Sequence, residues 1–186
     1  MPIFYAGCEW AFCVYRGRAG LNVLSGWING GGIGMDIYKE VALKVMQMAD
    51  YDAVMRLMQH SGGVVIREAD SREQTERYLL RNLGLSFVAV SQQGAGDVVG
   101  CAMCGHDGRR GYLQHVVVDG LYRRRGIARA LVERCLKALL SEGIFKCHLD
   151  VLAENHAAQA YWTNQGWMVR TDIYRYSYVI WGGGNV

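Results

Sequence analysis

The sequence lacks a long apolar run, a strong excess of one charge, and proline, of which it has one in 186 residues. No stretch approaches the roughly 20 apolar residues of a transmembrane helix, so we expect no membrane partner. A net charge of +3 does not by itself indicate nucleic-acid binding, which needs clustered basic residues. The N-terminus lacks the basic region of a signal peptide, and Glu9 interrupts its apolar run. We therefore expect a cytoplasmic protein.

Six cysteines are present, but their positions suggest no disulfide framework in a chain of this length. Cys101 and Cys104 form a C-x-x-C motif. A redox pair favours a helix N-terminus for its first cysteine, whereas the residues around this motif predict a strand. One such motif without a second pair is also weak for zinc. We predict that the two cysteines fill a strand and that no metal is bound.

A glycine-rich stretch, WINGGGIGMD, occupies residues 27–36. Such loops can bind phosphate, but this one fails the G-x-G-x-x-G pattern because Met35 takes its last position. Glycine codons begin with GG, so residues 30–32 match what a translated purine-rich ribosome-binding site would encode. We hypothesise that Met35 is the native start. Residues 1–34 would then be an N-terminal extension of upstream or non-native sequence, and residues 35–186 the domain.

Hydrophobic periodicity and cap residues predict the order β-α-α-β-β-β-α-β-α-β-β. Asp50 is a candidate N-cap for the first helix, and Ser71 with Gln74 forms an S-x-x-Q capping box for the second, which Gly84 ends. Turn sequences separate the next three strands, so we expect antiparallel pairing. The result is a mixed α/β (α+β) fold with about seven strands and four helices. Its strands are predicted at 41–46, 86–90, 98–104, 112–118, 146–152, 167–171 and 174–180, and its last two helices at 126–142 and 155–164.

The most informative segment is residues 116–135, VVVDGLYRRRGIARALVERC. A buried strand leads through a turn and several arginines to a helix start. A helix N-terminus presents unpaired N–H groups and positive potential, and the small Gly126 and Ala128 let an anion approach the backbone. These features predict a diphosphate site; the alternative is a solvated basic helix start. The surrounding arginines are Arg123, Arg124, Arg125 and Arg129.

Two motifs make the chain resemble the GCN5-related N-acetyltransferase (GNAT) family. The pattern Arg123-x-x-Gly126-x-Ala128 resembles that family's R/Q-x-x-G-x-G/A motif. The second motif runs Asn155-x-x-Ala158-x-x-x-Trp162-x-x-x-Gly166-Trp167 at the expected distance. The resemblance covers roughly residues 36–180 and includes the element order. It implies the GNAT fold, with a mostly antiparallel mixed sheet, and direct transfer of an acetyl group from acetyl-CoA to a primary amine in a ternary complex.

The resemblance also implies which residues hold the cofactor. The backbone of Val116 and Val118 would pair with the pantetheine arm like an added strand, and the strands would splay beyond this point. N–H groups of residues 124–128 would hold the diphosphate, and Arg125 or Arg129 would meet the ribose phosphate. Asn155 would reach the pantetheine, with Ala158 leaving room for it. The complete predicted set is Val116, Val117, Val118, Arg123, Arg124, Arg125, Gly126, Ile127, Ala128, Arg129, Asn155, Ala158 and Trp162.

The catalytic groups are less clearly marked. The attacking amine must lose a proton, yet Tyr112 takes the place where many family members carry a glutamate base. Asp150, on the strand before Asn155, and His115 are the candidate bases. Their alternatives are a carboxylate at a strand edge and a histidine in the core or pocket wall. An N–H of Val116 or Val118 would stabilise the oxyanion. Trp162 replaces the usual tyrosine acid and would line the thioester pocket. Either Tyr161 or water then protonates the thiolate, or no acid is needed.

Other interpretations stay open at this stage. The weak acid and base set also suits a non-catalytic CoA-binding sensor or interaction module. A nucleic-acid binder using Arg109, Arg110 and residues 123–125 would be expected to interleave exposed aromatics, and these do not. The acceptor would be a small-molecule amine or a peptide N-terminus. Alternating tyrosines on the last predicted strand suggest packing or a homodimer contact; they are Tyr174, Tyr176 and Tyr178.

Overall fold

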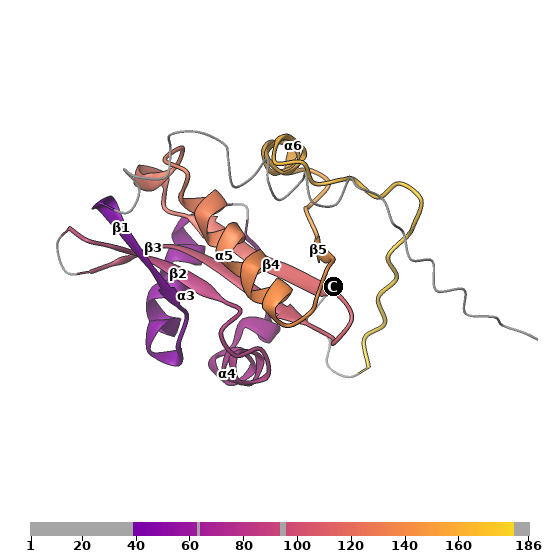
Figure 1. The fold of residues 1–186 in the computed structure, drawn as a ribbon, viewed down its shortest axis with the longest axis horizontal. Coiled ribbons are helices and arrows are strands. Elements are labelled where there is room, and N and C mark those ends of the chain that lie inside the picture. The colour runs from indigo at the N-terminus through magenta and orange to yellow at the C-terminus, as the bar shows by residue number, and fades with distance from the viewer. Residues whose placement is uncertain (1–38, 63, 94–95, 181–186) are drawn as a thin grey trace, which may run out of the picture. The chain divides into compact units, whose positions relative to one another are not determined.

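The structure is a computed structural model of the chain, described for residues 39–62, 64–93 and 96–180 (Figure 1). The glycine-rich stretch and Met35 lie outside these ranges, so the hypothesis of a start at Met35 stays a prediction. The described residues from Lys39 onward belong to a single contact-dense unit that begins at Met35.

One five-stranded sheet organises this unit, with the order β1-β2-β3-β4-β5. Its first four strands pair antiparallel and β5 runs parallel to β4. Helix α5 covers one face, and α3 and α4 cover the other (Figure 1). The predicted mixed α/β class is therefore confirmed. The strands are β1 (Val41–Val45), β2 (Phe87–Ser91), β3 (Val98–His106), β4 (Gly111–Val118) and β5 (Cys147–Leu149). The helices are α3 (Tyr51–His60), α4 (Arg72–Arg81), α5 (Ile127–Ser141) and α6 (His156–Asn164), with 3-10 turns η1 (Met48–Asp50), η2 (Glu68–Asp70) and η3 (Gly120–Tyr122).

The helices begin at the residues that the cap patterns predict. Ser71 caps α4, its hydroxyl accepting a hydrogen bond from the Gln74 N–H at 3.5 Å. Asn155 caps α6, its side-chain oxygen accepting from the Ala158 N–H at 3.0 Å. Asp50 precedes α3 but does not cap it through its side chain, because its carboxylate binds Lys44 and the Gln47 N–H.

The two cysteines of the C-x-x-C motif are buried on β3, as predicted. They are three residues apart, so they point to opposite faces of the sheet. Cys101 packs in the cluster beneath α3 and α4, and Cys104 packs in the cluster beneath α5. Burial raises the pKa of Cys101 to about 12, which keeps its thiol protonated and unreactive at neutral pH.

The last two predicted strands do not form, so the sheet has five strands rather than about seven. Residues 167–180 contain no strand, and Tyr174, Tyr176 and Tyr178 stay exposed. An alternating pattern of side chains allows a segment to form a strand, but pairing into a sheet also requires an adjacent strand edge with unpaired N–H and C=O groups. The neighbouring strand β5 is only three residues long and therefore offers such an edge over a short length.

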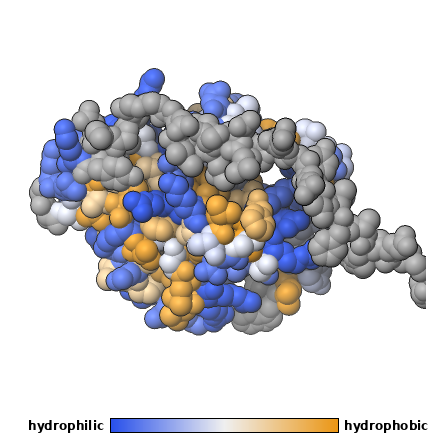
Figure 2. Space-filling view, in the orientation of Figure 1, coloured by the Kyte–Doolittle hydropathy of each residue, from blue (hydrophilic) through white to orange (hydrophobic). Residues whose placement is uncertain are grey.

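The face shown in Figure 2 mixes hydrophobic and hydrophilic residues, with hydrophilic side chains interrupting the apolar areas. Within the described ranges, no helix has both the length and the apolar character that crossing a membrane requires.

We expect Gly111→Ala to destabilise the fold by about 1–3 kcal/mol, because it overpacks the core. A Cβ at Gly111 would lie 2.5 Å from Leu139 Cδ1, and Leu139 is fully enclosed between α5 and the sheet. Urea unfolding measures the change. The matched control is Gly120→Ala, where an added Cβ meets nothing within 4 Å. Equal urea midpoints for the two variants would contradict the prediction.

Candidate functional site

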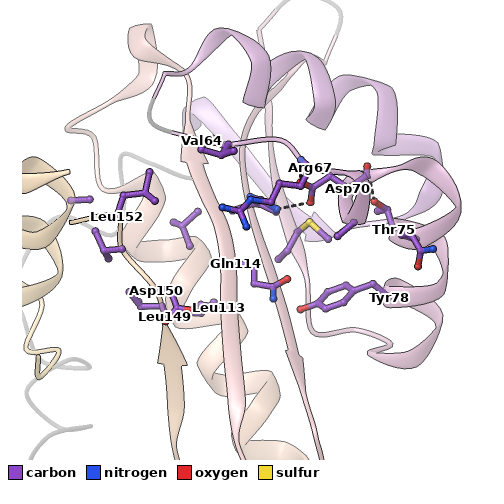
Figure 3. Close-up of a pocket in the computed structure, with 18 of the residues that line it drawn as sticks. Val64, Arg67, Asp70, Thr75, Tyr78, Leu113, Gln114, Leu149, Asp150 and Leu152 are labelled. Atoms are coloured by element: carbon purple, nitrogen blue, oxygen red, sulfur yellow. Dashed lines mark hydrogen bonds and ion pairs between the residues drawn. The ribbon is translucent and has the colours of Figure 1, made fainter. Parts of the chain in front are cut away.

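The two parallel strands of the sheet part early and leave a pocket between them. Pairing of β4 with β5 ends at Leu113 and Leu149, so the β4 edge from Gln114 onward has no β5 partner. A pocket of about 750 Å³ opens there. Figure 3 shows Asp70, Thr75 and Tyr78 on one side, Leu149, Asp150 and Leu152 on the other, and Leu113 and Gln114 of β4 between them. This matches the splaying that the family resemblance implies.

A β-bulge in β4 determines which side chains the pocket receives. Met103 on β3 pairs with Gln114 on β4, and Cys101 on β3 pairs with Val117 on β4. Two steps along β3 therefore correspond to three steps along β4, so β4 holds one extra residue. His115 adopts φ +46°, which is unusual for a residue with a Cβ. In a regular strand, successive side chains point to opposite faces. Around the bulge, four consecutive residues, Leu113, Gln114, His115 and Val116, all line the pocket.

His115 forms a hydrogen bond with a carboxylate from the other side of the pocket. Its Nε2 lies 2.7 Å from Asp70 Oδ1, and the two side chains are 20% and 12% exposed. The second carboxylate oxygen accepts a hydrogen bond from the Arg67 N–H at 2.8 Å. Burial raises the pKa of Asp70, but the hydrogen bonds from His115 and Arg67 and their positive charge outweigh it, so the net pKa lies below its usual value.

The other two candidate catalytic residues are placed differently. Asp150 lines the pocket, but its carboxylate is 67% exposed and forms an ion pair with Arg175. Tyr161 does not line the pocket; its ring packs edge-on against Trp162, with centroids 5.1 Å apart. Burial raises the pKa of Tyr161, which makes its phenol a weaker acid.

Residues of the second motif enclose the far side of the pocket. Asn155, Ala158 and Trp162 all line it from α6. The Asn155 side chain already caps the helix, and Trp162 packs edge-on against Trp167 at 5.2 Å. Trp162 is thus a rigid wall of the pocket. The indole has no acidic proton to offer, so its role here is to shape the cavity.

The arginine-rich loop follows β4 and leads into α5. Gly126 is the N-cap with φ +84°, a left-handed conformation that glycine adopts without strain. The first backbone bond across the helix start is Ala130 N–H to the Gly126 carbonyl, at 3.0 Å. The N–H groups of the first turn before Ala130 therefore have no intrahelical acceptor and face outward from the helix start.

The four arginines of this loop have different surroundings. Arg123 donates to the carbonyls of Val118 and Ser61, so it ties the loop to the end of β4 and to α3. Arg125 pairs with Glu40 at 2.7 Å, and Arg129 pairs with Glu133 at 3.0 Å. Arg124 is exposed with φ +64° and makes no hydrogen bond or ion pair with any residue in the described ranges.

These residues fit the diphosphate and pantetheine of the expected cofactor. The α5 start supplies N–H donors, a position without a Cβ at Gly126, and the uncommitted cation of Arg124. The open β4 edge runs from this loop to the pocket, and Val116 stands at its pocket end. The side chains of Val117 and Val118 instead pack in the two cores, so only the backbone of these two residues is available.

The sequence did not indicate the wall that faces the motifs. Asp70 and Tyr78 belong to η2 and α4 and carry no recognisable motif. The buried Tyr78 hydroxyl has no hydrogen-bond partner among the described residues, and Figure 3 shows it directed from α4 toward β4. On this side of the pocket, the capping box at Ser71 was the only sequence signal, and it predicted no more than the start of a helix. The lining on this side consists of Val64, Val65, Arg67, Ala69, Asp70, Gln74, Thr75, Arg77, Tyr78 and Arg81.

Comparison with known proteins places this geometry in a family. The model of the acetyltransferase (GNAT) family matches residues 51–167. An acetyltransferase of Pectobacterium atrosepticum is 34% identical over 116 residues, which is 62% of this chain and 79% of that protein.

Solved structures share the fold at lower identity. A PaiA N-acetyltransferase from Thermoplasma acidophilum, in complex with coenzyme A, has a TM-score of 0.61 and 16% identity, over 70% of this chain and 91% of its own. A structure of the NatC complex bound to Gag peptide and CoA has a TM-score of 0.57 and 22% identity, over 67% of this chain and 82% of its own.

Proposed function

This chain belongs to the acetyltransferase (GNAT) family and is an acyltransferase, and we propose that it moves an acetyl group from acetyl-CoA to a primary amine. The transfer is direct, within a complex of enzyme, cofactor and acceptor. Relatives named acetyltransferases favour this function over non-catalytic CoA binding.

The observation that carries the proposal is the continuity of the open β4 edge. At one end lies the start of α5, with Gly126 and Arg124, and at the other lies the pocket beside Val116. A long cofactor with an anionic end and a reactive end needs these two environments joined by a groove. Unpaired backbone groups along β4 are suited to hydrogen-bond the amides of such an arm.

Residues at different places along the groove have different roles. N–H groups at residues 124–128 and the Arg124 guanidinium bind the diphosphate. Asn155 and Ala158 border the arm, and Trp162 walls the reactive end. When bound, acetyl-CoA supplies the acetyl thioester. The backbone at Val116 orients and polarises its carbonyl, and a group in the pocket takes the proton from the amine. His115 and Asp150 both reach the pocket, whereas Tyr161 does not line it.

The acceptor enters from the side of η2 and α4, because α6 and the loop occupy the cofactor side. It is a small-molecule amine or a peptide N-terminus. One solved structure of this fold holds a Gag peptide and CoA, and another holds the bisubstrate analogue CoA-S-monomethyl-acetylneamine. Both classes of acceptor are therefore included in the test.

We expect acetyl-CoA to bind with Kd well below about 1 mM, equivalent to at least 4 kcal/mol of binding free energy. Isothermal titration calorimetry measures this directly. Thiol release is then followed with spermidine, neamine, free amino acids and a hexapeptide with a free α-amine. Turnover with one of them supports the proposal. Absence of binding overturns it, and binding without turnover on any amine supports the non-catalytic alternative instead.

A further inference from the structure

The pair of Asp70 and His115 joins two segments that are 45 residues apart in the chain. His115 sits at the bulge of β4 and Asp70 at the end of η2, directly before the N-cap of α4. Both side chains are largely buried, and both residues line the pocket. A positive φ is strained at a residue with a Cβ, so other contacts must hold His115 in this conformation.

The position of Asp70 is fixed by several hydrogen bonds. Its carboxylate accepts from the Arg67 N–H, and its carbonyl accepts from the Tyr51 hydroxyl at 2.9 Å and from the Thr75 hydroxyl at 3.3 Å. Figure 3 marks the contact between Asp70 and Thr75 with a dashed line. The carboxylate is therefore held with one oxygen toward Arg67 and the other toward His115, so the imidazole meets a rigid acceptor.

This contact determines the tautomer of the imidazole. An ionised carboxylate can only accept hydrogen bonds, so Nε2 of His115 carries the hydrogen. Nδ1 then carries the lone pair, and it makes no hydrogen bond with the described residues. A histidine that a carboxylate orients through one nitrogen can take a proton through the other.

We propose that Asp70 is the positioning residue that makes His115 the proton acceptor for the attacking amine. The inference rests on the proposed acetyl transfer and names its base. The amine nitrogen forms a bond to the acetyl carbon, the carbon–sulfur bond breaks, and the electron pair leaves on sulfur. The proton lost from the amine goes to Nδ1, and the resulting imidazolium is stabilised by the Asp70 carboxylate.

Other charged and titratable groups line the same pocket as His115 or contact its backbone. Arg67 on the η2 side and Arg77 and Arg81 on α4 contribute positive charge at the pocket wall. Asp150 beyond β5 contributes negative charge, but its ion pair with Arg175 offsets it. On β3, the Cys101 thiol donates to the His115 carbonyl at 3.4 Å, and burial keeps that thiol neutral. Tyr78 is neutral for the same reason, since burial raises its pKa.

The first test reads the tautomer without any substrate. Long-range proton–nitrogen correlation spectra of labelled protein distinguish a hydrogen on Nε2 from one on Nδ1, and His115→Gln assigns the signal. We expect Nε2–H in the wild type and a mixture in Asp70→Asn, with no change in the control Asp52→Asn, an exposed carboxylate paired with Arg72. A wild-type hydrogen on Nδ1, or a tautomer unchanged by Asp70→Asn, overturns the positioning role. If Asp70→Asn does not fold, the wild-type spectrum still decides.

The second test uses any amine that turns over with acetyl-CoA. We expect His115→Gln to lower kcat/KM by at least about 100-fold, a usual contribution of a general base. Asp70→Asn lowers it less, because Nδ1 of His115 remains while the imidazole loses the carboxylate that orients it. All variants are compared on one amine at one pH.

The outcomes separate this inference from the function on which it rests. Calorimetry with CoA, run on each variant, shows whether a lost rate reflects lost cofactor binding. The inference is overturned if the wild type turns over and His115→Gln retains more than about a third of the wild-type kcat/KM, because losing a general base lowers the rate far more. The acetyltransferase function would then still stand. No turnover on any amine, with the expected tautomer, overturns the function and leaves the Asp70–His115 positioning supported.

Discussion

Replacing both Arg124 and Gly126 with glutamate is expected to abolish coenzyme A binding, raising Kd by at least about 100-fold, or about 2.8 kcal/mol. The change places two negative charges where the helix start would hold a diphosphate, and it removes the exposed Arg124 guanidinium. Glutamate at Gly126 also cannot adopt φ +84° without strain. Calorimetric titration with CoA measures the effect, and urea unfolding confirms that the variant folds.

The matched control is Arg134→Glu, which reverses a charge on the same helix but away from its start. Arg134 is exposed within α5, beyond the first turn. Because helix-end electrostatics fall off within about one turn, we expect CoA affinity close to that of the wild type. A folded double variant that binds CoA as tightly as Arg134→Glu would show that the diphosphate site lies elsewhere.

Leu131→Ala is expected to lower the free energy of unfolding by about 2–5 kcal/mol, the usual range for a truncated core leucine. Leu131 is 0% exposed and packs from α5 onto the sheet, where its Cδ1 would lie 3.2 Å from a Cβ built at Gly100. Removing its side chain leaves a cavity that the tightly packed strand cannot close. The substitution also affects the site, because the packing of Leu131 on the sheet helps hold the start of α5 beside the end of β4.

Urea unfolding of Leu131→Ala is compared with Leu140→Ala on the same helix. Leu140 is 42% exposed, so its truncation removes little buried surface and creates no enclosed cavity. We expect less than half the destabilisation. If both variants unfold at the same urea concentration, α5 does not depend on Leu131 as its main anchor to the sheet.

Local chemistry made most of the elements predictable. Ser71 and Asn155 cap helices because their side chains satisfy N–H groups a few residues away. The turn sequences predicted antiparallel hairpins that the registers of β2, β3 and β4 confirm. Each of these signals acts over a few residues, so it can be read without knowing the rest of the fold.

The last predicted strand and the direction of the Tyr161 side chain both depend on distant neighbours, which local sequence patterns do not describe. The segment 174–180 alternates like a strand, yet it pairs with none of the described strands. The acid role of Tyr161 stays a prediction; of the two neighbours Tyr161 and Trp162, only Trp162 lines the pocket. Neighbouring side chains on a helix point in directions about 100° apart, and only the packing of α6 shows which of the two faces the cavity.

The fold class, the helix starts and the arginine–glycine loop before α5 are predictable from the sequence, because short-range hydrogen bonding and periodicity specify them. The surroundings of His115 depend on the packing of the whole fold. No local sequence pattern indicates the bulge in β4, around which four consecutive residues line one pocket, or the contact of His115 with Asp70. That pairing arises because α3 and α4 pack on the sheet face opposite α5 and bring η2 against β4.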